Sequence, residues 1–363
     1  MKRKGKKKGA FSIALTYAGC MLGAGFVSGQ ELWQYFGAYG KKGVLSLVLS
    51  FILLGVFTLI LLLLSRKTGK TAMDDLILKA DLPVVKDIIG ILTAVIIFSN
   101  VSIMIAGIGA LVEEACGIAR PVVNLIVTIL IGIFSYFGIS GMMAVFDFLV
   151  PVLVIATLAL CGVRIGNAGI SGIDLSEKAL NPLLGGCGLA CINYAAMNFY
   201  GVLTVFPPIG KETEKKRTFS TALILGTMLL ILSGLAVILA LSTSETAVLK
   251  EVPMQEIAGE MGAVPDIVIS VMLTFAMFGV GVSYQVSTMS YLEGRFVKFM
   301  KKGRSFVLLM LLAAAYLLSL FGFGDLISLL YPLFGYFGML LMLLIGIRYA
   351  GTFFSLKHEK RLQ

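Results

Sequence analysis

The chain has 363 residues, of which 58% are hydrophobic and 14% charged, and several uncharged apolar runs reach the roughly 20 residues that cross a bilayer. This composition excludes a soluble enzyme and predicts an all-α polytopic membrane protein with one domain over residues 1–363. The formal net charge is +10, but the Lys and Arg residues lie between apolar stretches and no aromatic-basic segment is present. We therefore expect the lipid bilayer as a partner and no nucleic acid.

The chain begins with a basic segment, MKRKGKKKGA, before a long apolar stretch. A signal peptide has a similar start, but this apolar stretch is too long and no A-x-A-like cleavage site closes it. We expect a retained first helix, with residues 1–9 as a cytoplasmic tail.

Ten membrane spans are predicted from hydrophobic periodicity and length. They cover residues 10–39, 43–64, 87–115, 120–139, 142–163, 186–207, 218–242, 265–291, 305–321 and 325–347. With the N-terminus inside, 24 of the 30 Lys and Arg residues fall on the cytoplasmic side, and residues 348–363 form a second cytoplasmic tail. The expected location is a bacterial cytoplasmic membrane.

The first span contains glycines at positions 19, 23, 25, 29 and 37. As one helix, the stretch from Gly9 to Gly40 would measure roughly 45 Å, against about 30 Å of hydrocarbon. Glycine also weakens helices, so the span is predicted to be discontinuous and to expose backbone groups to a ligand or ion. The alternative is that these glycines let another helix pack closely.

The spans repeat with an offset of about 175 to 185 residues, so residues 10–163 and 186–347 form two halves of five spans each. Because five is odd, the second half enters the membrane from the opposite side, which makes the repeat inverted. Span 6 is then predicted to be discontinuous like span 1. Asn198 to Gly201 is the expected unwound segment, since Asn and Gly tolerate non-helical backbone.

The motif GAGF at residues 23–26 and the 5+5 plan resemble the amino acid/polyamine/organocation (APC) superfamily, whose fold is the LeuT type. More closely, GAGFVSGQELWQYFG at residues 23–37 resembles the YkvI-type bacterial membrane proteins of that superfamily. The resemblance covers essentially the whole chain. It implies an amino acid or related zwitterion as substrate, although Ala24 replaces the usual Ser.

Substrate contacts are expected at the two discontinuous spans. Free N–H groups at Gly23, Ala24 and Gly25 favour a substrate carboxylate, because a helix N-terminus attracts anions. Asn198 and Gly201 of span 6 would supply the opposite wall, and Asn100 in span 3 could face the substrate.

Ser283 and Ser287 share one face of span 8. The resemblance implies a sodium ion between span 1 carbonyls and hydroxyls of span 8, with Ser283 as the best match. The alternative is that both hydroxyls bond their own helix.

Glu31 and Asp147 are the acids well inside predicted spans, where an ionisable group is costly unless it is paired or hydrated. Glu31 is a candidate for the external vestibule, for proton coupling or for structural hydrogen bonding. Asp147 is expected to contact cytoplasmic Lys or Arg. Cys187 and Cys191 lie one turn apart, and we expect packing rather than a transition-metal site.

These features predict a secondary transporter that works by alternating access and is coupled to sodium or protons. No Walker A motif and no other cofactor signature is present. The alternative is a membrane-embedded nutrient receptor with the same fold and no coupled ion. An intramembrane enzyme is not supported, because the sole histidine, His358, lies in the polar tail.

Overall fold

The computed structural model describes residues 9–21, 24–70, 76–77, 83–137, 142–212 and 216–359, and within them the chain is helical without strands. The first half contains α1 (Ala10–Met21), α2 (Ala24–Ser28), α3 (Gln30–Tyr35), the 3-10 turn η1 (Gly37–Tyr39), α4 (Gly40–Thr68), α6 (Pro83–Cys116), α7 (Arg120–Phe137) and α8 (Met142–Ala168). The second half contains α9 (Cys187–Glu212), α10 (Lys216–Leu241), α11 (Pro253–Met261), α12 (Ala263–Arg295), α13 (Val297–Ser319) and α14 (Phe323–Glu359).

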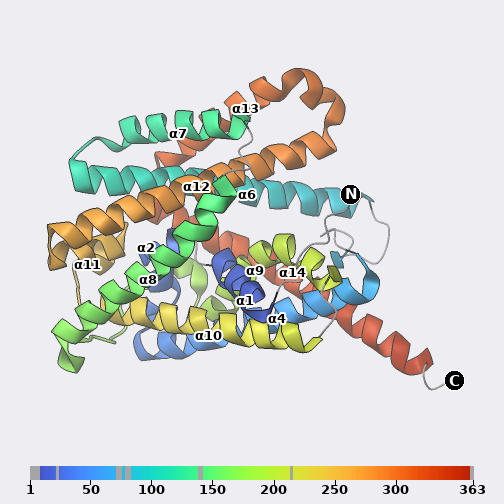
Figure 1. Cartoon of the computed structure of the whole chain (residues 1–363), viewed down its shortest axis with the longest axis horizontal. Helices are drawn as coiled ribbons and strands as arrows, with labels where there is room; N and C mark the ends of the chain where they lie inside the picture. The colour runs from blue at the N-terminus through green and yellow to red at the C-terminus, as the bar shows by residue number, and fades with distance from the viewer. Residues whose placement is uncertain are drawn as a thin grey trace.

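The long helices form two groups (Figure 1). In one, α4 packs against α9, while α10 packs against both α1 and α4. In the other, α6 packs against α7, α12 and α13. Two further helices join the groups: α8 contacts α10 and α12, and α14 contacts α9 and α6.

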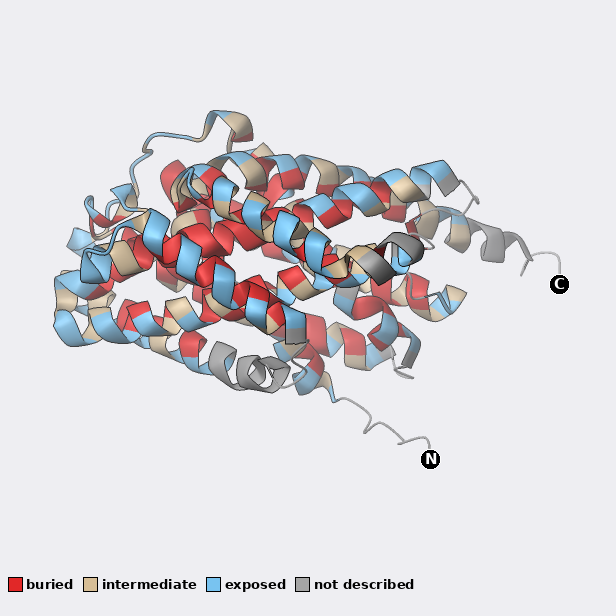
Figure 2. Ribbon diagram, turned by 90° about the horizontal axis from the view of Figure 1, so that it is seen from above, coloured by how far each residue is buried: buried red, intermediate tan, exposed pale blue. Residues whose placement is uncertain are grey.

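On α7 the exposed face is apolar and the buried face carries polar residues, the reverse of a helix at the surface of a water-soluble protein. Its buried face carries the polar Asn124 and Thr128, and its exposed face carries Ile126, Ile129 and Ile133. The Asn124 amide donates to the Ser319 hydroxyl of α13 at 3.0 Å. A helix that turns isoleucine outward and amide inward is stable in lipid rather than water. Exposed residues lie along the outer faces of the helices (Figure 2), and many of them on other helices are large and apolar too, such as Leu45, Val95 and Leu309. The chain is a multi-pass membrane protein.

Six helices in the described residues are long and apolar enough to cross a membrane, and a bent pair within α9 makes up to seven. Three shorter apolar helices, Ala10–Met21, Arg120–Tyr136 and Gly303–Ser319, fall where spans 1, 4 and 9 are predicted. The six long helices, the bent pair and the three shorter helices follow one another in the order of the ten predicted spans. That all ten cross the membrane stays a prediction.

The discontinuity predicted in span 6 was wrong in its position. Residues 198–201 are helical within α9, and the helix instead bends by 60° between Cys187–Leu203 and Val205–Lys211. Pro207 and Pro208 follow directly inside the helix. Because proline has no N–H, these two residues leave the carbonyls four positions earlier, at 203 and 204, without helical donors. The bend therefore follows the prolines and not the Asn and Gly residues.

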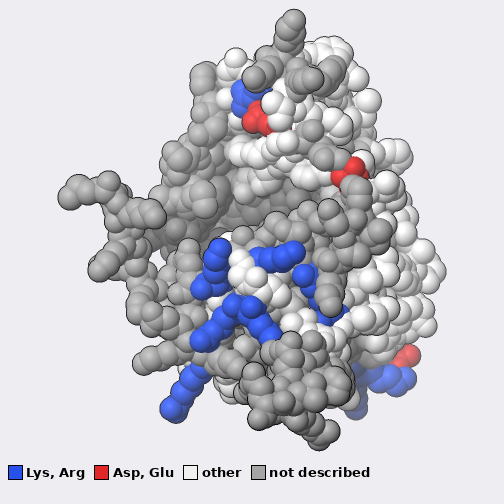
Figure 3. Space-filling view, turned by 90° about the vertical axis from the view of Figure 1, so that its right-hand side faces the viewer, with Lys and Arg blue, Asp and Glu red and all other residues white. Residues whose placement is uncertain are grey.

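The two ends of the molecule differ in charge. Lys and Arg side chains gather at the end where α4 finishes and α14 runs out (Figure 3), and there the Lys67 ammonium donates to the Thr352 carbonyl at 2.8 Å. The opposite end, which the distribution of Lys and Arg predicts to be extracytoplasmic and which is called the outer end here, pairs its cations with acids. These pairs include Lys42–Glu177, Arg164–Glu260, Lys178–Asp174 and Lys250–Glu114. Hydrogen bonds from Lys178 and from Ser176 lower the pKa of Asp174 to about 2.

Candidate functional site

The first span is interrupted between α2 and α3. Helix α2 runs from Ala24 to Ser28, and α3 begins at Gln30. Between α2 and α3, Gly29 has φ of 83°, a left-handed conformation that a residue with a side chain rarely adopts. The described interruption of span 1 lies at Gly29, within the predicted stretch but four residues after Gly25, which is helical in α2. This interruption turns α3 relative to α2.

This turn brings Glu31 back to Gly25. In one continuous helix the two residues would be separated by roughly 9 Å along the axis and would face different sides. Here a Cβ atom added to Gly25 would overlap the Glu31 carboxylate at Oε2 and would lie 3.3 Å from the Tyr331 hydroxyl of α14. Glycine at position 25 therefore leaves room for the close approach of these two groups.

The Glu31 side chain is buried, with 4% exposed. The Tyr194 hydroxyl of α9 donates to Glu31 Oε1 at 2.9 Å. One acid on the first span thus lies close to tyrosines from α9 and α14, which both belong to the second half of the chain.

Aromatic packing fixes Tyr194 beside Glu31. Its ring packs edge-on against Tyr35, Phe36 and Phe51, with centroid separations of 5.2, 4.8 and 5.7 Å. Such pairs contribute about 0.5–1.5 kcal/mol each beyond their buried area. The hydroxyl that holds Glu31 therefore sits on a rigid ring.

A second set of hydrogen bonds ties α3, α9 and α14 together next to the site. The Tyr35 hydroxyl donates to Asn193 Oδ1 at 2.9 Å, and Asn193 Nδ2 donates to the Pro332 carbonyl at 2.9 Å. Both Tyr35 and Asn193 are fully buried. Since Pro332 follows Tyr331 directly, Asn193 also positions the tyrosine that faces Gly25.

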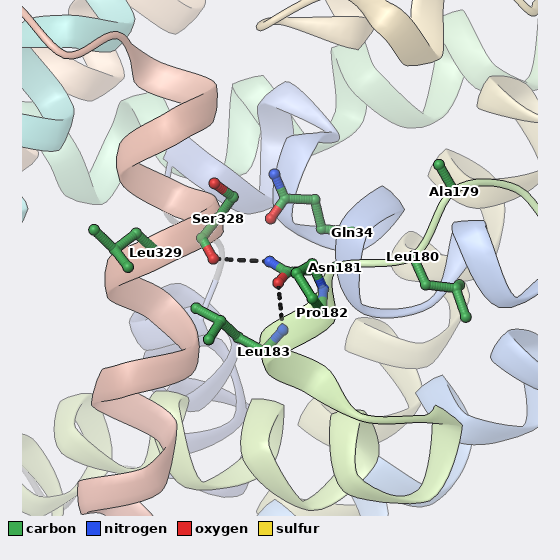
Figure 4. Close-up of a pocket in the computed structure, with 8 residues that line it drawn as sticks. All are labelled: Gln34, Ala179, Leu180, Asn181, Pro182, Leu183, Ser328 and Leu329. Atoms are coloured by element: carbon green, nitrogen blue, oxygen red, sulfur yellow. Dashed lines mark hydrogen bonds between the residues drawn. The ribbon is translucent and has the colours of Figure 1, made fainter.

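A depression of about 360 Å³ opens on the outer side of the site (Figure 4). Gln34, one helical turn beyond Glu31 on α3, forms part of its wall together with Ser328 of α14 and Asn181.

The segment that joins α8 to α9, residues 173–186, crosses this depression and is called the outer strap here. The Asn181 amide donates to the Ser328 carbonyl at 2.7 Å, and the Tyr336 hydroxyl donates to the Leu183 carbonyl at 2.6 Å (Figure 4 shows the first bond). The Lys178 N–H donates to the Ala38 carbonyl at 2.9 Å. These bonds fasten the outer strap to α14 and to η1.

Of the predicted substrate residues, the structure places Gly25 within α2 beside Glu31, while Gly23 lies outside the described residues and Ala24 begins α2. A Cβ added to Gly201 would lie 3.4 Å from the Cys20 carbonyl, so α9 approaches α1 closely there. Asn198 and Asn100 instead donate to carbonyls of their own helices, at Tyr194 and Ile96.

Ser283 and Ser287 are exposed on α12, and the Ser287 hydroxyl donates to the Ser283 carbonyl at 2.8 Å. The Ser287 bond is the alternative stated above, in which the hydroxyl bonds its own helix. A sodium site at Ser283 stays a prediction. Asp147 lies in α8, but its side chain is outside the described part of the structure.

The Cys187 thiol donates to the Lys42 carbonyl at 3.2 Å, and neither Cys187 nor Cys191 forms a disulfide. No group of three or more His, Cys, Asp or Glu side chains gathers as a metal site within the described residues.

Sequence reasoning identified Gly25 and Glu31 but missed the partnership of Tyr194 and Tyr331. A phenol in the middle of an otherwise apolar span is a usable signal, because its hydroxyl needs a partner when buried. Both residues carry that signal.

The fold is similar to that of two solved transporters. The chain superposes on Mhp1, a nucleobase-cation-symport-1 family transporter in a closed conformation with bromovinylhydantoin bound, with a TM-score of 0.58 and 11% identity, over 86% of this chain and 74% of that one. A mutant of the Eremococcus coleocola manganese transporter matches with a TM-score of 0.50 and 10% identity, over 92% of this chain and 75% of that one. These matches establish the fold.

No family model matches the chain. The uncharacterized membrane protein YkvI of Bacillus subtilis strain 168 is 27% identical over 335 residues, which cover 91% of this chain and 93% of the relative. The uncharacterized protein YyaD of the same strain is 26% identical over 334 residues, with 90% and 93% covered. The first relative is of the kind that the motif at residues 23–37 predicted, while membership of the APC superfamily stays a prediction.

Proposed function

We propose that the protein is a secondary active transporter that carries a small substrate by ion-coupled alternating access. The observation that carries this proposal is the Glu31 carboxylate, buried at the interruption of the first span and held by Tyr194 of the second half. An ionisable group at membrane depth marks a substrate or ion pathway by default. Its position between elements of both halves is where transporters built from repeats bind their substrates.

The architecture we infer is ten spans in a 5+5 inverted repeat. Three pairs of contacts support it, because exchanging each helix of the pair for its counterpart in the other half gives another observed contact. The α4–α9 contact becomes the α10–α1 contact, α6–α7 becomes α12–α13, and α8–α10 becomes α14–α4. Such exchange symmetry lets two halves of one chain rock against each other around a central site.

The substrate we propose is an amino acid or a related zwitterion, bound where α1 and α2 face α9. Gly23, Ala24 and Gly25 are proposed to contact its carboxylate, with Asn198, Gly201 and Asn100 as further wall residues. Sodium at Ser283 and Ser287, or a proton at Glu31, is the proposed coupling ion. The proposed location is the bacterial cytoplasmic membrane with both termini inside.

The test is uptake into proteoliposomes. Radiolabelled amino acids are offered to the purified, reconstituted protein under an inward sodium gradient, under an inward proton gradient, and under neither. We expect accumulation with one gradient, and its loss in Glu31→Gln but not in Glu245→Gln. Glu245 is a matched control because its side chain is 85% exposed at the outer end. Binding of a ligand without uptake under any gradient would favour a receptor instead.

A further inference from the structure

The ends of α4 and α9 lie against each other at the end of the molecule where Lys and Arg gather (Figure 3). The Ser65 hydroxyl of α4 donates to the Pro207 carbonyl of α9 at 2.6 Å, and it lies 2.7 Å from the Lys70 carbonyl. A Cβ added to Gly210 of α9 would lie 2.8 Å from the Leu62 carbonyl of α4. The segment of α9 beyond its 60° bend is therefore held beside the last turns of α4.

Helix α10 begins at the same level. A Cβ added to Gly55 of α4 would lie 2.9 Å from the Thr227 hydroxyl of α10. Further along α10, a Cβ added to Gly234 would lie 2.8 Å from the side chain of Leu47, so the two helices run in opposite directions. Arg217 stands ten residues before Thr227 and therefore lies level with the last turns of α4. The start of α10 thus forms one corner with the ends of α4 and α9.

Four cationic side chains are exposed at this corner, which is called the basic corner here. They are Lys67 and Lys70 at the end of α4, Lys211 at the end of α9 and Arg217 at the start of α10. Within the described residues, no ion pair includes Lys211 or Arg217. Cations from three helices at one place attract an anion, and a guanidinium offers paired N–H donors that match two phosphate oxygens.

The face of α10 above Arg217 is apolar and exposed. Ile224, Met228 and Leu232 lie along this face with 58%, 63% and 61% of their surface exposed. Arg217 precedes Ile224 by seven residues, which is two helical turns, or roughly 10 Å, on the same face. An amphiphile with an anionic head and hydrocarbon chains matches this whole pattern, whereas a soluble anion matches the cations alone.

We propose that the basic corner binds the phosphate of an anionic phospholipid, whose acyl chains lie along the face of α10 formed by Ile224, Met228 and Leu232. Lys211 and Arg217 hold the phosphate, and Lys67 and Lys70 add positive charge beside it. In a zwitterionic phospholipid the headgroup carries its own cation, which offsets the attraction. The lipid joins α4, α9 and α10, and its binding is independent of the proposed transport function.

The experiment measures thermal unfolding of the purified full-length protein in an uncharged detergent. Phosphatidylglycerol, phosphatidylcholine with the same acyl chains, and glycerol 3-phosphate are added separately over one range of concentrations. A molecule that binds the folded state raises the melting temperature according to its affinity. We expect stabilisation by phosphatidylglycerol alone, and a smaller effect at high salt because exposed charges are screened.

The variants assign the effect to the basic corner. Lys211→Gln and Arg217→Gln should each weaken phosphatidylglycerol binding about fivefold, and the double variant about 25-fold. The control is Lys41→Gln at the outer end. Lys41 is an exposed cation at the end of an apolar exposed face of α4, but it stands on one helix instead of at a corner of three. This variant should leave the affinity unchanged.

Native mass spectrometry with equal amounts of both lipids gives a second readout. We expect the parent protein to retain phosphatidylglycerol in preference to phosphatidylcholine, and the double variant to lose this preference. The proposal is overturned by equal binding of the two lipids, by unchanged affinity in the double variant, or by an equal loss in Lys41→Gln. Stabilisation by glycerol 3-phosphate as strong as that by phosphatidylglycerol would assign the corner to a soluble anion and overturn the lipid site.

Discussion

Replacing Gly25 with alanine tests the geometry of the site. The new methyl group would overlap Glu31 Oε2 and would lie 3.3 Å from the Tyr331 hydroxyl. Glu31 cannot swing away freely, because its other oxygen is held by Tyr194 at 2.9 Å and only 4% of the residue is exposed. Overpacking of this kind costs about 1–3 kcal/mol.

Alanine also favours the helical conformation of α2 by about 1 kcal/mol relative to glycine, which offsets part of the cost. The single variant should therefore lose roughly 0–2 kcal/mol of stability. The informative quantity is the coupling with Glu31. In a Glu31→Ala background the overlap is gone, and Gly25→Ala should stabilise the protein by about 1 kcal/mol, which gives a coupling of about 1–3 kcal/mol.

The assay is thermal unfolding of the four proteins of this double-mutant cycle in one detergent. Gly19→Ala in α1 is the matched control, because nothing lies within 4 Å of a Cβ at that position. That variant should gain stability whether or not Glu31 is present. A Gly25→Ala effect of the same size in the parent protein and in the Glu31→Ala background would refute the contact between Gly25 and the carboxylate.

Three further predictions concern other parts of the chain. Tyr194→Phe removes the hydroxyl that holds Glu31 and should lower the free energy of unfolding by about 1–3 kcal/mol, measured by thermal unfolding. The exposed Tyr136→Phe is the control, and a loss of stability in Tyr194→Phe smaller than in this control would contradict the bond. Burial raises the pKa of Glu260, but hydrogen bonds from Ser244 and Thr246, together with the charge of Arg164, lower this pKa overall. The ionised Glu260 therefore stabilises the fold at pH values above its unfolded pKa of about 4.3, and this stabilisation is lost as the pH falls. Glu260→Gln should accordingly lower the melting temperature at pH 7, by a margin that shrinks on acidification, and a margin that stays constant with pH would count against this pairing. Cys116 is exposed at the end of α6, so with the N-terminus inside a membrane-impermeant maleimide should label it on intact cells, and labelling of Cys116 only after the cells are opened would reverse the orientation.

The order of the helices was predictable because the bilayer sets their length and each apolar run is local in the sequence. An interruption of span 1 was predictable from its glycines, which weaken a helix, but the prediction centred it on Gly23 to Gly25, whereas the described break lies at Gly29. The position of the bend in span 6 was predicted wrongly because two sequence features that disturb a helix lie within ten residues of each other. Asn198 and Gly201 tolerate irregular backbone, but Pro207 enforces it by removing a donor.

The site was only half predictable because its contacts join distant parts of the chain. Glu31 was recognisable alone as an acid in an apolar span. Its hydrogen bond to Tyr194 spans 163 positions, and the approach of Tyr331 depends on how α14 packs on α9. The periodicity of span 8 placed Ser283 and Ser287 on one face, but periodicity does not reveal which face turns inward.

The bond from the Asn181 amide to the Ser328 carbonyl has a consequence for how the outer side can open. In an ordinary helix the N–H four residues later would take this carbonyl, but at that place α14 has Pro332, which has no N–H. The outer strap thus bonds a carbonyl of α14 that has no N–H donor four residues later in its own helix. Detaching the strap breaks no bond within α14, and water at the surface supplies a replacement donor. The outer strap is therefore a separable part of the wall of the outer depression, bonded to α14 at Ser328, three residues before the tyrosine that faces Gly25.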